Sequence, residues 1–174
     1  PAPAVILYTE CSAKGGTEYG GSGALLAFAD GSELVGSSAA GRYCSSTHAE
    51  LVALRTAFER LLGAASRLPC GAVVHVVCDS QPALYRVARD ASFCDGEQEV
   101  QIWSLLNRLH AACSPQVFMQ YVPSHVGLAG NERVDRIADT ASKECNQFAA
   151  PLDFLAVKAR LKARVRAEWL AGVD

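Results

Sequence analysis

Short apolar runs alternate with helical periodicities along the chain, and together they predict an α/β fold. The runs that predict strands are residues 5–10, 20–28, 33–43, 72–78 and 116–122. Helical spacing of apolar residues predicts helices over 47–62, 82–89, 100–113, 132–145 and after Pro151. A three-strand meander followed by alternating helices and strands is typical of a mixed sheet with helices on both faces.

Turn and cap residues mark the ends of these elements. Asp30-Gly31 is a favoured two-residue hairpin turn, so the strands on either side of it should pair antiparallel. Ser46 or Thr47 is expected to cap the first long helix, Ser80 the second and Asn131 the fourth.

The last helix differs from the rest of the chain in its charge. Residues 151–174 hold five basic against three acidic residues, whereas the whole chain has a net charge of −2. If the protein binds a polyanion through positive charge, we therefore expect the binding surface to be confined to one part of the chain. We divide the chain into a domain over residues 1–150 and a basic amphipathic helical extension over 151–174. One face of this helix carries Phe154, Val157, Leu161, Val165 and Trp169, and we expect Trp169 to anchor it to the domain.

The composition of the chain bears on membrane association and on the redox compartment of the protein. No apolar run approaches the length of about 18 residues that a membrane span needs, so no membrane partner is expected. The seven cysteines are odd in number and form no CxxC pair, and several lie in apolar runs. They indicate buried free thiols in an intracellular, reducing compartment such as the nucleus or cytoplasm.

Four carboxylates lie where strands end or helices face the sheet. Glu10 and Asp79 each end an apolar strand, and in open α/β sheets this end binds ligands. Glu50 lies on a helix stripe that faces the sheet, where an unpaired charge is costly. Asp135 is expected in the first turn of its helix, where the dipole favours an acid. Simple helix capping remains open for Asp79, and so does a helix-start acid for Asp135. Together, however, such all-oxygen sets suit Mg²⁺.

The motifs that contain these acids resemble those of the ribonuclease H family. The matching segments are Tyr8-Thr9-Glu10-Cys11-Ser12, Thr47-His48-Ala49-Glu50-Leu51, Cys78-Asp79-Ser80-Gln81 and Pro123-Ser124-His125-Val126-Gly127 through Gly130-Asn131-Glu132-Arg133-Val134-Asp135. The last segment is the most specific, and the similarity spans about residues 4–145 in the right order. The Val-Pro-Ser-His-Val-Gly stretch and the basic, Trp-bearing tail look most like the ribonuclease H domains of non-LTR retrotransposon polyproteins.

The resemblance implies a fold, a reaction and a metal site. The sheet order would be 3-2-1-4-5 with strand 2 antiparallel, and the reaction would be endonucleolytic hydrolysis of the RNA strand of an RNA/DNA hybrid. The resemblance further implies that two Mg²⁺ ions, with Mn²⁺ as a substitute, are held by Glu10, Glu50, Asp79 and Asp135. His125 matches the family's loop histidine, which helps to protonate the leaving group or to release the product.

The same resemblance implies substrate contacts. The residues expected to touch the hybrid are Ser12, Ser46, Thr47, Ser80, Gln81 and Asn131. Several match positions along the minor groove, where RNA displays its 2′-hydroxyls. Helix capping explains Ser46 and Thr47 equally well. Some cellular members carry a basic loop where this chain has the acidic residues 90–97. Phosphate contacts are therefore expected from the terminal helix or from an adjacent reverse transcriptase domain of the same polyprotein.

One position departs from the family pattern. The family has Asp where this chain has Glu10, and Mg²⁺ tolerates little distortion of its ligands. Two hypotheses follow: an active endoribonuclease, or a catalytically weakened scaffold or hybrid-binding module. If the extra methylene is a handicap, Glu10→Asp raises the cleavage rate; a loss would show that the site is built around Glu. A DNA nuclease of the same fold is a third reading, disfavoured by the loop around His125.

Overall fold

The sheet of the predicted order forms the centre of the molecule. The computed structural model describes residues 2–15, 18–89, 96–148, 150 and 152–172. Five strands pair in the order β3-β2-β1-β4-β5. β2 is antiparallel to β1 and β3, whereas β4 is parallel to β1 and β5 is parallel to β4. The strands are β1 (Val5–Lys14), β2 (Glu18–Phe28), β3 (Glu33–Tyr43), β4 (Val73–Cys78) and β5 (Gln116–Tyr121). The predicted fold class is confirmed.

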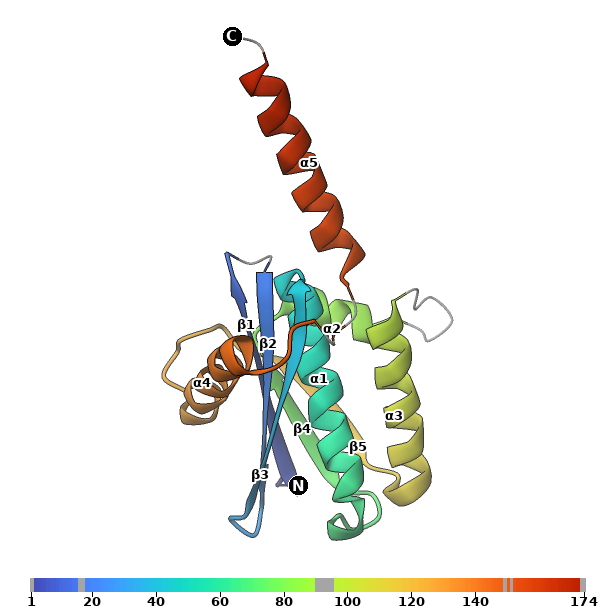
Figure 1. The fold of residues 1–174 in the computed structure, drawn as a ribbon. Helices are drawn as coiled ribbons and strands as arrows, with labels where there is room; N and C mark the ends of the chain where they lie inside the picture. Colours follow the sequence, from blue (N-terminus) through green and yellow to red (C-terminus); the bar gives the residue numbers. More distant parts are fainter. Residues whose placement is uncertain (1, 16–17, 90–95, 149, 151, 173–174) are drawn as a thin grey trace.

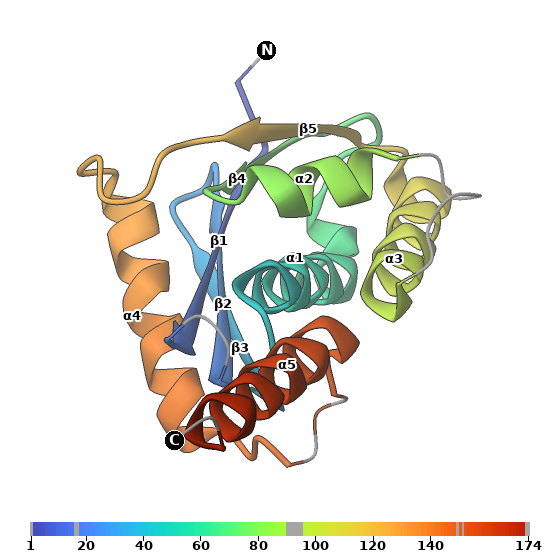
Figure 2. The ribbon, with the colours of Figure 1, turned by 90° about the horizontal axis from the view of Figure 1, so that it is seen from above.

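Helices cover both faces of this sheet. α4 packs against β1 and β2 on one face of the sheet, while α1 and α3 lie on the side of the opposite face (Figure 2). The core between the sheet and α1 consists of apolar side chains with little or no exposed surface; among them are Leu7, Leu26, Leu54, Phe58, Leu61, Val74, Val76 and Ile102. The helices are α1 (Ser46–Gly63), α2 (Gln81–Ala88), α3 (Glu97–Cys113), α4 (Ala129–Glu144) and α5 (Phe154–Ala171), with a short 3₁₀ turn, η1 (Ala65–Arg67).

β1 is longer than predicted, so the expectation that Glu10 ends the strand was wrong. The parallel pairing with β4 stops at Thr9, which lies opposite Cys78. The antiparallel pairing with β2 continues past Glu10, which lies opposite Gly23, as far as Lys14. Glu10 therefore lies just beyond the end of the parallel pair, because β2 supplies backbone partners after β4 has ended.

Two predicted caps were wrong and one was right. α1 is capped by Ser45, whose Oγ accepts a hydrogen bond from the His48 backbone N–H at 3.2 Å, and not by Ser46 or Thr47. Ser80 caps α2 as predicted.

α4 begins earlier than predicted, and this changes the position of two candidate residues. It starts at Ala129, so Asn131 is not a cap but lies within the first turn with its side chain turned inward. Asp135 consequently falls in the second turn and not in the first. α3 likewise starts at Glu97, ahead of the predicted residue 100, with acids in its first turn, where the helix dipole favours them. Most of the acidic connection predicted over 90–97 lies outside the described residues.

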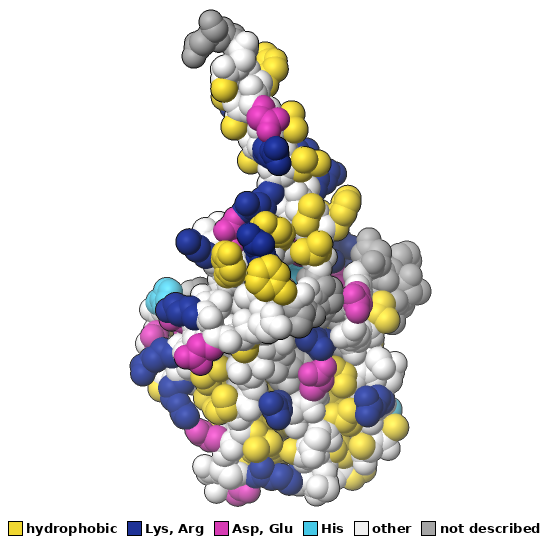
Figure 3. All heavy atoms as spheres, in the orientation of Figure 1, with side chains coloured by type: hydrophobic (Ala, Val, Ile, Leu, Met, Phe, Trp, Pro, Cys, Tyr) yellow, Lys and Arg dark blue, Asp and Glu magenta, His cyan; other side chains and the backbone are white. Residues whose placement is uncertain are grey.

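α5 forms as predicted but does not pack its apolar face on the domain. It projects from the end of the domain where α1 begins (Figure 1). Apolar and basic side chains both remain visible along it (Figure 3). Trp169 is 68% exposed, so the expectation that it anchors the helix was wrong. In the described part of the chain, no helix has the length and apolar character needed to cross a membrane.

Polar contacts attach the first turns of α5 instead. The Asp153 carboxylate caps the helix by accepting a hydrogen bond from the Leu155 backbone N–H at 2.9 Å. The same carboxylate accepts hydrogen bonds from the backbone N–H and the hydroxyl of Ser45, at 2.8 and 2.6 Å. One turn further on, Arg160 pairs with Glu18 and lies 4.5 Å from the ring centre of Tyr43. The attachment is therefore made near the start of the helix, far from Trp169.

Two glycines of β2 allow α4 to approach the sheet closely. A Cβ on Gly21 would overlap the backbone of α4 at Ala138 and Ser142. A Cβ on Gly23 would meet the carbonyl oxygen of Val134 at 2.6 Å. Because α4 carries Asn131 and Asp135, while Gly23 lies opposite Glu10, this approach brings α4 to the acid on β1.

We expect Gly21→Ala to lower the free energy of unfolding by about 1–3 kcal/mol, because the rigid α4 backbone must move away. Urea denaturation measures the loss. Gly63→Ala is the matched control: nothing lies within 4 Å of its added Cβ, so we expect a change of at most about 0.5 kcal/mol. Equal losses in the two variants would contradict close approach at Gly21.

Candidate active site

Glu10 reaches from β1 toward α4 and is held there by an amide. Its side chain is 7% exposed, and its Oε1 accepts a hydrogen bond from Asn131 Nδ2 at 2.6 Å. Asn131 is itself buried, and its Oδ1 has no hydrogen-bond partner among the described residues. An unsatisfied buried oxygen beside a carboxylate is the kind of acceptor that a cation or a cation-bound water satisfies.

Glu50 approaches from the opposite face of the sheet. It lies in the second turn of α1 and is 3% exposed, which confirms that it points toward the sheet. The thiol of Cys78 donates a hydrogen bond to Glu50 Oε2, with a distance of 3.6 Å between sulfur and oxygen. The Cys11 thiol donates a hydrogen bond to the Ser46 carbonyl oxygen at 3.5 Å, at the start of the same helix. Sequence reasoning missed these two contacts, although both thiols lie next to candidate acids in the matching segments.

Asp79 lies directly after β4, and its charge acts on both Glu10 and Glu50. Since Ser80 is the cap of α2, the capping explanation for Asp79 was wrong. Its Oδ2 accepts a hydrogen bond from the Ser124 hydroxyl in the loop that follows β5. Ligand atoms of Glu50, Cys78 and Asp79 all lie within 4.8 Å of one another. The end of β4 therefore brings three groups together that are each able to bind a metal.

Electrostatics show that Asp135 belongs to the same group. Burial raises the pKa of Glu10 to about 9, and the charges of Asp79, Glu50 and Asp135 add to this effect. Burial and the charge of Asp79 likewise raise the pKa of Glu50 to about 8. The charges of the three other predicted carboxylates thus all act on Glu10. Such a set of oxygen donors fits a divalent cation, which offsets this repulsion.

The loop before α4 lies beside this acid cluster. Ser124 contacts Asp79, and the next residue, His125, is exposed with a left-handed backbone (φ 56°). Gly127 adds a second positive φ of 79°. The loop thus presents an imidazole to solvent, one residue away from a side chain that touches the cluster.

The predicted substrate-contacting residues differ in their exposure. Ser46 and Gln81 are exposed, whereas Ser12, Thr47 and Ser80 are partly buried. Asn131, the sixth, is buried with its amide on Glu10, so the structure shows it positioning that carboxylate. Contact of any of the six with substrate stays a prediction.

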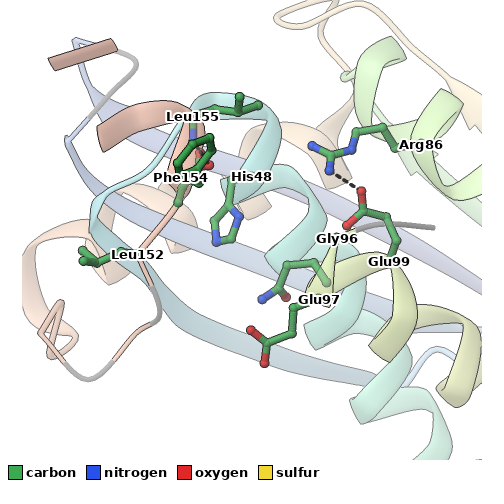
Figure 4. A pocket seen from close by; sticks show the side chains of 10 residues that line it. His48, Arg86, Gly96, Glu97, Glu99, Leu152, Phe154 and Leu155 are labelled. Atoms are coloured by element: carbon green, nitrogen blue, oxygen red, sulfur yellow. Dashed lines mark hydrogen bonds and ion pairs between the residues drawn. The ribbon is translucent and has the colours of Figure 1, made fainter. Parts of the chain in front are cut away.

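A cavity of about 330 Å³ lies beside the start of α1 (Figure 4). His48 and Phe154 line it, and the Arg86–Glu99 ion pair lies on the side formed by α2 and α3. Burial lowers the pKa of His48, whose Nε2 has no partner among the described residues. Sequence reasoning gave His48 no role of its own, although it lies inside the Thr-His-Ala-Glu segment.

The sheet order and the gathered carboxylates define a ribonuclease H-like α/β fold with a candidate metal-dependent centre. The RNase H family model matches residues 2–143. The chain therefore belongs to the ribonuclease H family and is a domain of the hybrid-specific endoribonuclease class. Ribonucleases H usually use divalent metal ions, in agreement with the donors gathered here.

Solved structures show the same fold. Ribonuclease H1 from the halophilic archaeon Halobacterium salinarum has a TM-score of 0.59 and 23% identity, over 79% of this chain and 96% of that one. The N-terminal ribonuclease H domain of a Mycobacterium tuberculosis protein, fused to maltose-binding protein, has a TM-score of 0.57 and 18% identity, over 81% of this chain and 94% of that one. A comparison with curated proteins found no match.

We expect the metal-free protein to lose stability as the pH rises from about 7 to about 9. Glu10 and Glu50 have an ordinary pKa of 4.5, so the folded state retains protons here that the unfolded state has lost. Each increase in pH between 4.5 and the raised values therefore favours unfolding, and the effect levels off above about 9. Calorimetry in EDTA should show a fall in Tm on the order of several °C.

The matched control is Glu10→Gln, which removes one of the two raised carboxyl groups and should flatten this slope. Saturating Mg²⁺ should flatten it too, because a bound cation favours the ionised carboxylates. A Tm in EDTA that stays constant or rises over this range would contradict the raised pKa values.

Proposed function

We propose that this domain hydrolyses the RNA strand of RNA/DNA hybrids at the cluster formed by Glu10, Glu50, Asp79 and Asp135. The observation that carries the proposal is the convergence of these four acids from β1, α1, β4 and α4: burial raises the pKa of Glu10 to about 9, and the charges of the three other acids add to this effect. The cluster would hold two Mg²⁺ ions, with Mn²⁺ as a substitute. When bound, such ions activate a water molecule and stabilise the leaving oxygen of a phosphodiester.

The protein's own side chains would keep the acids in place. The Asn131 amide fixes one oxygen of Glu10, and the Ser124 hydroxyl fixes one oxygen of Asp79. These bonds limit the rotation of both carboxylates, so less conformational freedom is lost when cations and substrate bind. His125, exposed in the neighbouring loop, would donate a proton to the departing oxygen or assist product release.

Substrate recognition would use the surface around the cluster. Ser46 and Gln81 are exposed at the starts of α1 and α2, and Ser12, Thr47 and Ser80 lie next to them in the chain or on β1. These side chains would contact the minor groove, where hydroxyl and amide groups can bond the RNA 2′-hydroxyls. The basic residues of α5 would supply phosphate contacts, since they project from the same end of the domain at which α1 begins.

We further propose that the activity serves reverse transcription of a non-LTR retrotransposon, next to a reverse transcriptase domain. The support is the Val-Pro-Ser-His-Val-Gly stretch and the basic helix that follows the residues matched by the family model. The free thiols of the described residues, which include the buried Cys44, Cys78 and Cys113, support a reducing compartment such as the nucleus or cytoplasm.

The direct test is cleavage of an RNA/DNA hybrid with labelled RNA in Mg²⁺. We expect cut RNA from the hybrid and none from the matching RNA or DNA duplex. Asp79→Asn should lower the rate by at least about 10²-fold, because it removes a charge that acts on both Glu10 and Glu50.

Asp139→Asn is the control for that loss of charge, since Asp139 lies on the exposed face of α4 and pairs only with Lys143 among the described residues. Its rate should stay within about 2-fold of wild type. Uncut hybrid at high protein concentration, in both Mg²⁺ and Mn²⁺, would favour the scaffold or hybrid-binding module instead.

We expect Glu10→Asp to lower the cleavage rate by about 10-fold or more, because the shorter side chain moves its carboxylate away from Asn131. Single-turnover kinetics on the same hybrid measure the effect. Asn131→Ala, which removes the amide but leaves Glu10, should also lower the rate. A faster Glu10→Asp variant would show that the extra methylene is a handicap and that the site is not built around glutamate.

A further inference from the structure

The apolar face of α5 is exposed on a helix that projects from the domain (Figure 1). Leu161, Val165 and Trp169 are 61%, 57% and 68% exposed. Basic side chains lie among these apolar ones along the helix (Figure 3). A contiguous exposed apolar surface with charged residues at its rim is typical of a binding site.

Two adjoining grooves follow this face. The first has a volume of about 510 Å³ and lies between Tyr43, the last residue of β3, and the Val157–Arg164 part of α5. The second has a volume of about 490 Å³ and extends from Leu161 to Trp169. Leu161 lines both grooves, so we treat them as one surface and call it the α5 track. Since an α-helix rises 1.5 Å per residue, the track is about 18 Å long between Val157 and Trp169.

Every charged residue that lines the α5 track is basic. Arg160 and Arg164 form ion pairs with acids of β2 and of α5 itself. Lys162 and Arg166 have no acidic partner in the described part of the chain. Arg166 lies one helical turn before Trp169, and Lys162 lies two turns before it. Unneutralised cations next to an exposed indole attract a polyanion that also carries flat apolar groups.

The start of the track already shows stacking between aromatic rings and guanidinium groups. The Arg160 guanidinium lies 4.5 Å from the centre of the Tyr43 ring. Arg42 lies 5.2 Å from the same ring and 5.3 Å from the ring of Phe148, which is 75% exposed. Aromatic rings and guanidinium planes are the protein groups on which unpaired nucleic-acid bases stack.

We propose that the α5 track binds single-stranded nucleic acid. Unpaired bases stack on Trp169 and Tyr43, and the phosphates lie beside Lys162 and Arg166. A duplex suits the track less well, because its bases are stacked on one another and offer only their edges to side chains. The length of about 18 Å corresponds to roughly five stacked nucleotides at 3.4 Å each.

This binding goes beyond the phosphate contacts to the hybrid proposed above for α5, and it requires neither the acid cluster nor hydrolysis. A consequence for cleavage does rest on the proposed function. α5 projects from the end of the domain at which α1 begins, so a strand that leaves the hybrid unpaired at this end would reach the track. The track would then hold substrates that have a single-stranded extension.

Fluorescence anisotropy with a labelled oligothymidylate tests the binding without hydrolysis. We expect the wild-type chain in EDTA to bind this single strand at least about 5-fold more tightly than a DNA duplex of equal length. Trp169→Leu keeps an apolar helix former but removes the ring, and should weaken single-strand binding at least about 5-fold. Phe118→Leu is the matched control, because this ring is 51% exposed on β5, at the opposite edge of the sheet from β3. Its affinity should stay within about 2-fold of wild type.

Salt dependence tests the phosphate contacts separately from the stacking. Arg166→Gln should reduce the slope of log affinity against log salt concentration by about 0.7, the value for one phosphate contact to a single strand. Arg108→Gln, which removes an exposed charge from α3, is the control and should leave the slope unchanged. Circular dichroism confirms that the variants keep their helix content.

The proposal is overturned if the duplex binds as tightly as the single strand, if Trp169→Leu leaves the single-strand affinity unchanged, or if Arg166→Gln and Arg108→Gln change the slope equally. Light scattering identifies a different occupant of the apolar face. A wild-type dimer that Trp169→Leu converts to a monomer, with no change in oligonucleotide affinity, would assign this face to a second copy of the chain and overturn the proposal.

The consequence for cleavage has its own measurement. A hybrid with a single-stranded extension should have a KM at least about 5-fold lower than a blunt hybrid, and Trp169→Leu should remove this difference. Oligonucleotide binding without hydrolysis would support the α5 track and overturn the proposed function. Hydrolysis without oligonucleotide binding would do the reverse.

Discussion

The repulsion that Glu10 and Glu50, both buried, meet from neighbouring carboxylates is the constraint on which the centre of this protein depends. Four acids from four elements meet where the parallel pairing of β1 and β4 stops, and burial with their charges raises the pKa of Glu10 to about 9. The fold holds them there with neutral donors: the Asn131 amide, the Ser124 hydroxyl and the Cys78 thiol. Donors without charge keep the carboxylates in position and leave their negative charge for a cation.

The sheet makes this convergence geometrically simple. Glu10 and Glu50 approach from opposite faces of the sheet, so they meet only beyond the point where β4 has ended. Asp135 comes from α4, which reaches the sheet because Gly21 and Gly23 of β2 lack side chains. The stability of the fold and the assembly of the cluster therefore depend on the same contact between helix and strand.

The sequence predicted the strands and the burial of Glu50 from apolar periodicity, whereas the sheet order was implied by the resemblance of its motifs to the ribonuclease H family. It did not predict that α4 begins at Ala129, since the first turn of this helix is polar and carries no apolar stripe. The bond from Asn131 to Glu10 was therefore missed as well. Periodicity also says that α5 has an apolar face, but it does not say what covers that face. The exposure of Trp169 could therefore not be predicted from the sequence.

The mounting of α5 has a mechanical consequence. The helix has 18 residues, so it is a stiff arm about 27 Å long. Its base is fixed by Asp153 to Ser45, the cap of α1, and by Arg160 to Glu18 of β2. A pull on the far end would exert a torque on this joint, and α1 carries Glu50 only a turn away from it. A load on the far end of α5 would thus be borne by the joint at the start of α1, the helix that carries Glu50.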